Sequence, residues 1–151
     1  MQFHHELVMP NADLPFKMFL FEGGEGNYYR EKHWHRSIEI FAVLEGGLQF
    51  FINEEEHPLR AGDIILVNSN EIHSIYSPVP NRTVVLQIPL KTFEDYFTGD
   101  QFIRFAHHSK EHDRAAASLI GEMFEFYTEK RCGYEMKVKS QYFMFLYLLV
   151  T

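Results

Sequence analysis

The feature that most constrains this chain is the run His33–Gly46, where polar side chains recur inside an otherwise strand-forming stretch. The run reads HWHRSIEIFAVLEG, and its β-branched and aromatic residues favour extended structure. Because side chains in a strand alternate between two faces, we expect His33, His35 and Glu39 on one face. The other face would carry Trp34, Arg36, Ile38 and Ile40. Two imidazoles and a carboxylate on one face suit either a transition-metal site or a polar pocket.

Further strand-like runs are separated by turn residues. Two turns are predicted at Asn53-Glu54 and Ala61-Gly62, and we interpret the acidic stretch between them as a solvated loop. A tight turn is also predicted at 45–47. Several short strands at this spacing indicate a sandwich or barrel. The expected strands are Leu14–Phe21, His35–Leu44, Leu48–Ile52, Asp63–Asn68 and Val84–Leu90, and the expected core includes Phe41, Val43, Phe50, Ile52, Ile64, Leu66 and Ile88.

The hydrophobic period changes near residue 91 and becomes helical. A short helix is predicted over Lys91–Phe97, a long one over Ser109–Arg131, and another from about Glu135 to the C-terminus. The last helix ends on YFMFLYLLVT without a cap or a polar tail, so we expect the native protein to continue beyond it. The predicted organisation is a β-barrel with an N-terminal arm over residues 1–90 and a helical segment over 91–151.

Charge and composition exclude some classes of partner. A net charge of −7 argues against this chain gripping nucleic acid by itself, since phosphate contacts need clustered Lys and Arg. The longest apolar run has nine residues, too few to span a bilayer. A single cysteine, Cys132, suits a reducing compartment. These observations predict a cytoplasmic protein without membrane contact.

Two segments together resemble the paired motifs of the cupin superfamily. The first is His33-x-His35-x3-Glu39-x6-Gly46, and the second runs from Gly62 to His73. The match is incomplete, because the usual residues are replaced at Asn27, Asn68, Asn70 and Ser77. The resemblance implies a mainly β fold: a cupin double-stranded β-helix, or jelly-roll, barrel followed by C-terminal α-helices.

The cupin resemblance also implies a ligand set. The four metal positions of that family correspond to His33, His35, Glu39 and His73. Three imidazoles and one carboxylate suit Zn, Mn, Ni or Fe. The alternative is that the same residues line a polar pocket without a metal.

The phrase GDIILVNSNEIHS, followed by helices, resembles the N-terminal effector-binding and dimerisation domain of AraC-type transcription regulators. That resemblance implies a small-molecule effector, for which a sugar is one candidate, and DNA contact only through a helix-turn-helix domain absent from this chain. Tyr28, Trp34 and Tyr76 lie beside the motifs and are candidate walls of the pocket. No catalytic residue is assigned. The rival hypotheses are a stand-alone metal-dependent enzyme of dioxygenase or isomerase type that uses the same four residues, and a plain sugar-binding or structural cupin.

An apolar stripe on the long helix must be buried, either against the barrel or against a second subunit. The resemblance favours a homodimer, with an interface formed by Ala116, Leu119, Ile120, Met123 and Tyr127. Two further polar residues are weighed separately. Glu71 is interpreted either as a carboxylate that orients His73 or as an exposed loop acid, and His107 is interpreted as a surface residue.

Overall fold

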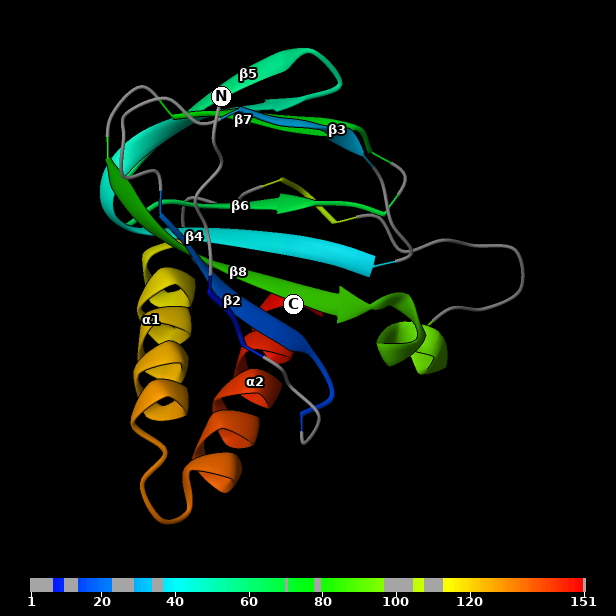
Figure 1. Cartoon of the computed structure of the whole chain (residues 1–151). Coiled ribbons are helices and arrows are strands. Elements are labelled where there is room, and N and C mark those ends of the chain that lie inside the picture. The colour runs from blue at the N-terminus through cyan, green and yellow to red at the C-terminus, as the bar shows by residue number, and fades with distance from the viewer. Residues whose placement is uncertain are drawn as a thin grey trace.

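The computed structural model describes residues 7–9, 14–22, 29–33, 37–69, 71–77, 80–96, 105–107 and 113–150, with the backbone alone at 7–9, 29–33 and 94–96. The described strands are β1 (Leu7–Met9), β2 (Lys17–Glu22), β3 (Tyr29–His33), β4 (Ser37–Ile52), β5 (Glu55–Arg60), β6 (Ile64–Val67), β7 (His73–Tyr76) and β8 (Asn81–Pro89). They are followed by the short 3-10 helix η1 (Leu90–Tyr96) and by α1 (Asp113–Glu129) and α2 (Tyr134–Val150). The expected order of β-barrel first and helices second is confirmed (Figure 1).

Strand β4 organises both layers of the barrel. Its first part pairs with β8 and β6, and its second part pairs with β5 and β7. Strands β1 and β2 extend the first layer, which we call the helix-facing sheet, and β3 extends the second, the outer sheet. Figure 1 shows β4 passing from one sheet to the other at one edge of the barrel. The fold expected from the cupin resemblance is therefore present.

The tight turn predicted at 45–47 is wrong, because β4 runs through it as one strand of 16 residues. The register with β8 shifts between Val43 and Glu45, and Gly46 has φ +75°. A Cβ at Gly46 would overlap the carbonyl oxygen of Pro80. Glycine is needed here because β4 bends at a left-handed residue while the chain from Pro80 passes directly over it. The two glycines thus mark a corner between sheets rather than a hairpin.

Between residues 53 and 62, the two predicted turns are confirmed and the predicted loop is wrong. Asn53 and Glu54 both have positive φ and connect β4 to β5 as a two-residue hairpin, as predicted. The second turn, at Ala61-Gly62, is also present. The stretch between them is a strand rather than a solvated loop, because only Leu59 of β5 is buried and the acidic residues sit on its exposed positions.

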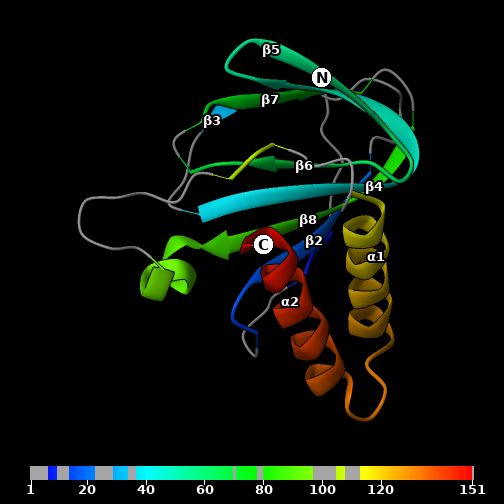
Figure 2. The same cartoon turned by 180° about the vertical axis from the view of Figure 1, so that it is seen from behind.

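Both faces of the helix-facing sheet are buried, which explains the nearly continuous apolar strands. Alternate residues such as Phe41, Val43 and Val85 point into the barrel. Their neighbours, such as Ile40 and Leu86, point out to the helices, which cover this face in both views (Figures 1 and 2). The expected core residues Phe41, Val43, Phe50, Ile52, Ile64, Leu66 and Ile88 are all buried.

The helical layer lies close to its predicted boundaries. The short helix predicted at 91–97 is η1, and the long helix is described from Asp113, so its expected start at Ser109 falls outside the described residues. Lys130 and Gly133, both with positive φ, turn the chain into α2. In the described part of the chain, no helix is long and apolar enough to cross a membrane.

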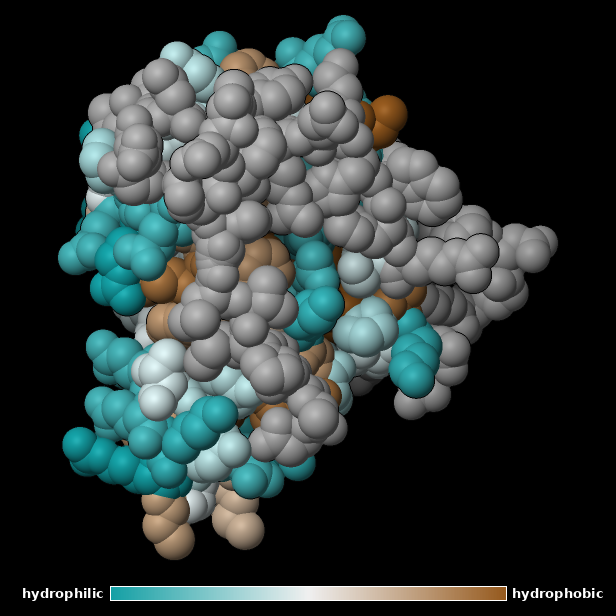
Figure 3. All heavy atoms as spheres, in the orientation of Figure 1, coloured by the Kyte–Doolittle hydropathy of each residue, from teal (hydrophilic) through white to brown (hydrophobic). Residues whose placement is uncertain are grey.

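The apolar stripe of α1 requires a correction. Ala116, Ile120, Met123 and Tyr127 are at most 3% exposed, and Leu119 is partly buried against the same core. They pack between the helix-facing sheet and α2, which is the alternative that the sequence left open. Figure 3 shows mainly hydrophilic atoms over the outward side of α1. These five residues are therefore core positions, and a dimer would need a different surface.

We predict that Gly46→Ala destabilises the protein by about 3 kcal/mol, because it adds left-handed strain to a clash with backbone. Urea unfolding measures the effect. Gly133→Ala is the matched control: Gly133 has φ +82° but nothing within 4 Å of an added Cβ. It should cost only about 1 kcal/mol. Equal losses in the two variants would contradict the close approach of Pro80.

Candidate functional site

Two of the predicted site residues meet inside the barrel. Glu39 lies on β4, opposite Val67 of β6 and Gln87 of β8. His73 begins β7 in the outer sheet, opposite Ile52. Both side chains are about 1% exposed, although they are polar. The barrel therefore brings a carboxylate from one sheet against an imidazole from the other, far from each other in sequence.

The pair is held by polar and aromatic neighbours. Nε2 of His73 lies 3.1 Å from Oε1 of Glu39. The other carboxylate oxygen accepts a hydrogen bond of 2.8 Å from Nε2 of Gln87. The imidazole of His73 stacks on Phe50, with centroids 5.7 Å apart and planes 4° apart, and it meets the edge of Phe41 at 6.0 Å. The two neighbouring rings and the contact with Glu39 orient the imidazole.

A buried carboxylate beside an imidazole offers a defined chemistry. Removing one partner of a buried polar contact leaves the other unsatisfied in an apolar interior, which is costly. The pair therefore keeps two polar groups inside the barrel. Together with Gln87, it presents hydrogen-bond donors and acceptors against the aromatic walls Phe41 and Phe50. Such a combination fixes the orientation of a small polar ligand, and the same oxygen and nitrogen atoms are metal ligands.

The remaining predicted residues divide into two groups. The Cα of His33, at the end of β3, is paired with that of His73. The side chain of His33, and the whole of Tyr28, Trp34 and His35, lie outside the described residues. Tyr76 is 40% exposed, while His73 and Ile75 of the same strand are buried, so the structure does not bring Tyr76 to the pair. Among described side chains, no three His, Cys, Asp or Glu residues form a metal-binding group.

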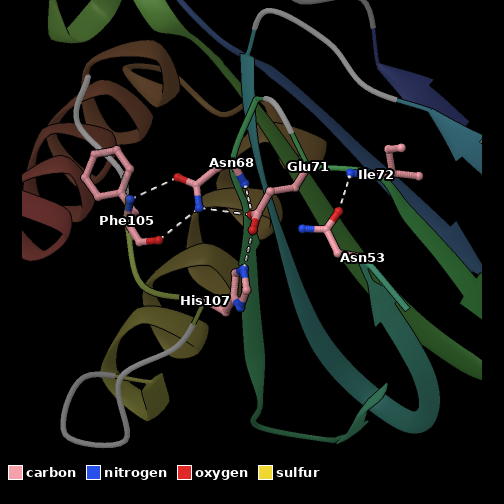
Figure 4. A network of polar contacts seen from close by, with 6 residues as sticks. All are labelled: Asn53, Asn68, Glu71, Ile72, Phe105 and His107. Atoms are coloured by element: carbon pink, nitrogen blue, oxygen red, sulfur yellow. Dashed lines mark hydrogen bonds and ion pairs between the residues drawn. The ribbon is translucent and has the colours of Figure 1, made fainter. Parts of the chain in front are cut away.

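Sequence reasoning missed a polar network next to the site. Glu71 is 2% exposed, which excludes the exposed loop acid, and its Oε2 lies 2.7 Å from Nε2 of His107. Its Oε1 accepts hydrogen bonds from the backbone and side-chain nitrogens of Asn68. Figure 4 shows Asn68 and Glu71 extending from the β6–β7 loop toward Phe105 and His107. The interpretation of His107 as a plain surface residue is corrected. No local pattern pairs residues 36 positions apart.

The network sets the ionisation of Glu71. Burial raises the pKa of this carboxyl, but the hydrogen bonds from His107 and Asn68 outweigh burial and leave the pKa below its ordinary value of 4.5. A carboxyl with a depressed folded-state pKa stabilises the fold at pH values above its unfolded pKa. That stabilisation is lost as the pH falls through the folded pKa.

We therefore predict that Glu71→Gln makes the free energy of unfolding less dependent on pH in the acidic range. The free energy of unfolding of the wild type, measured by urea titration with a chelator present, should fall more steeply below about pH 4.5 than that of the variant. Glu56→Gln, which removes an exposed carboxyl of β5, is the control and should follow the wild type. Parallel profiles for wild type and Glu71→Gln would rule out this role.

Barrel topology and site together define a cupin with a polar group buried inside the barrel, and comparisons with solved structures agree on the fold. A cupin superfamily protein of Desulfitobacterium hafniense DCB-2 aligns with TM-score 0.50 and 13% identity, covering 55% of this chain and 74% of the other. A cupin 2 conserved barrel domain protein of Salinispora arenicola CNS-205 aligns with TM-score 0.50 and 15% identity, covering 60% and 76%.

Sequence comparison gives the family. The chain belongs to the AraC-like ligand binding domain family, whose profile matches residues 15–146. A curated relative, the uncharacterized HTH-type transcriptional regulator YdeC of Bacillus subtilis (strain 168), is 38% identical over 47 residues. That match covers 31% of this chain and 16% of the relative, so the chain spans a small part of that protein's length.

Proposed function

We propose that this chain is the effector-sensing domain of an AraC-type transcription regulator and that it binds a small molecule inside the barrel beside Glu39 and His73. The observation that carries the proposal is the buried contact between these two side chains, 3.1 Å apart, in a chain of the AraC-like ligand binding family. Fold maintenance alone would be served better by hydrocarbon at these positions, since buried polar pairs rarely stabilise more than apolar packing.

The neighbours of the pair indicate the class of ligand. A carboxylate, an imidazole and the Gln87 amide offer acceptors and donors for hydroxyl groups, and the aromatic rings offer a flat apolar wall. A sugar or another small polyhydroxylated molecule combines these two surfaces. We assign no catalytic residue: the same groups would serve a metal-dependent cupin enzyme, but the family of this chain favours ligand sensing.

The proposed partner of the full-length protein is DNA. DNA would be contacted by a helix-turn-helix part of the full-length protein, in keeping with the HTH-type relative and with the net charge of −7 on this domain. Such a regulator would act in the cytoplasm. Ligand binding controls DNA binding only if the ligand prefers one arrangement of the domain, so the site must be coupled to the helices.

We expect a screen of sugars and other hydroxylated metabolites by thermal shift, followed by calorimetry, to yield a binder. Gln87→Leu removes the hydrogen bond to Glu39 and should weaken binding about tenfold. Gln141→Leu is the matched control, because it removes an equivalent amide-to-carboxylate bond, to Glu122, in the helical layer. A binder that loses affinity in Gln141→Leu but not in Gln87→Leu would place the site elsewhere.

A divalent transition metal is the cofactor that we propose for the same site. Glu39 and His73 would hold it together with His33 and His35, and it would supply a Lewis-acidic centre to which ligand oxygens bind. The donor set fits, because the described pair supplies one oxygen and one nitrogen ligand, both buried and within 3.1 Å of each other. The backbone pairing of His33 with His73 supports the third position.

Elemental analysis of protein grown in metal-replete medium, without chelator or affinity histidines, tests the metal. We expect about one equivalent of Zn, Mn, Ni or Fe, lost in His35→Ala and in Glu39→Gln. His57→Gln removes a histidine of β5 outside the pair and should keep the metal. A wild-type protein without metal would leave a metal-free polar pocket as the account of these residues.

The homodimer is also proposed, but through α2 instead of the α1 stripe. Met136, Phe143, Tyr147 and Val150 recur at helical spacing on its outward face and are 80%, 63%, 60% and 44% exposed. Met144 widens the patch. Large apolar side chains rarely gather on the surface of a monomer, so the patch fits a helix-to-helix contact between two copies.

Sedimentation velocity should show a dimer that Phe143→Glu converts to a monomer, because the charge would be buried in the contact. Ser118→Glu adds the same charge to an exposed position of α1 and should leave the dimer intact. A wild type that sediments as a monomer at micromolar concentration would refute this interface.

A further inference from the structure

We propose that Asn68, Glu71 and His107 form the mechanical link through which the barrel site is coupled to the helical layer. In this role Glu71 and His107 are positioning residues, which neither contact the proposed ligand nor form part of the Glu39–His73 pair. This role rests on the proposed function in one respect only, namely that the Glu39–His73 pair is the sensing site. Its residues lie on either side of the boundary between barrel and helices (Figure 4).

The first half of the link fixes the loop that precedes His73. The backbone nitrogen of Asn68 donates to Oε1 of Glu71 at 2.8 Å, and the backbone nitrogen of Glu71 donates to the carbonyl oxygen of Asn68 at 3.1 Å. These bonds close a compact turn two residues before His73. A shift of the imidazole along β7 would therefore act on this turn.

Ile72 continues the same connection toward the barrel. Its backbone nitrogen lies 3.2 Å from Oδ1 of Asn53, and its carbonyl oxygen accepts from the backbone nitrogen of Asn53 at 2.9 Å. The start of β7 is thus held by the β4–β5 hairpin on one side. On the other side, the turn at 68–71 connects it to the segment 105–107, and we infer that movement of His73 passes through this turn.

The second half of the link joins that turn to the segment 105–107. The side-chain amide of Asn68 donates to the carbonyl oxygen of Phe105 and accepts from its backbone nitrogen, both at 2.9 Å. His107 contributes its imidazole to Glu71 at 2.7 Å and its carbonyl oxygen to the backbone nitrogen of Leu66, also at 2.7 Å. Four contacts therefore bind this segment to β6 and the loop after it.

The segment 105–107 in turn belongs to the helical layer. Phe105 packs against Phe93 of η1 with ring centroids 5.2 Å apart and borders the core shared with α1 and α2. A cavity of about 100 Å³ is lined jointly by His107, by Ala116 of α1 and by Phe145 of α2. Displacement of the segment would alter the packing of α1 and α2 against the helix-facing sheet.

Burial makes the link stiff. Asn68 is 5% exposed and Glu71 is 2% exposed, so their hydrogen bonds do not exchange freely with water. Breaking one of them leaves an unsatisfied buried polar group, which costs more than a surface bond. Contacts of this kind have few alternative arrangements, and for that reason they transmit a displacement instead of absorbing it.

Hydrogen–deuterium exchange tests the coupling without any effector. The perturbation is Glu39→Gln, which alters the site and leaves the link intact. We expect exchange in peptides covering 105–107 and the first turns of α1 to rise about fivefold in the wild-type background. In the His107→Leu background, Glu39→Gln should add no further increase. His107→Gln, which keeps a donor, should restore the increase.

Ser77→Ala is the matched control background: Ser77 is buried at the opposite end of β7 and accepts a 2.7 Å hydrogen bond from Asn81. There the response to Glu39→Gln should equal that of the wild type. If His107→Leu does not fold, Glu71→Gln replaces it. An equal response in the broken and intact backgrounds, or no response of 105–107 in any of them, overturns the link. Neither outcome depends on whether the domain binds an effector.

Discussion

The contact between Glu39 and His73 is the interaction on which the functional interpretation of this structure depends. The two side chains come from different sheets, are almost fully buried and touch at 3.1 Å. In an interior that also holds Phe41 and Phe50, Gln87 donates a hydrogen bond to the Glu39 carboxylate, and the ring of Phe50 stacks on the imidazole of His73. The pair thus places polar groups among the apolar side chains of the barrel interior, and these groups are where we propose that a ligand binds.

The helix-facing sheet connects the Glu39–His73 pair to the helices. Its strands are buried on both faces, so a residue such as Ile40, next to Glu39, already packs in the core shared with α1 and α2. The side-chain network at Asn68 and Glu71 adds a second route, through the loop that leads into His73. A sensing domain needs its site and its output surface to share structural elements, and this chain provides such elements on two sides of the barrel.

The sequence predicted what depends on local pattern. Alternation placed Glu39 on the face opposite Ile38 and Ile40, and turn chemistry placed the Asn53-Glu54 hairpin, because both follow from a few adjacent residues. It failed where distant contacts decide. Gly46 was interpreted as part of a turn, since the passing carbonyl of Pro80 is not visible in sequence. His107 was assigned to the surface because its partner, Glu71, lies 36 residues away. The α1 stripe was assigned to a dimer, although the chain itself buries it.

The central claim is that a ligand is sensed at the imidazole of His73. Long-range proton–nitrogen spectra of the histidine side chains, recorded while a bound metabolite is titrated, test it most directly. The account predicts that the His73 resonances shift in proportion to occupancy. Saturating ligand that leaves the His73 resonances unchanged would contradict the account.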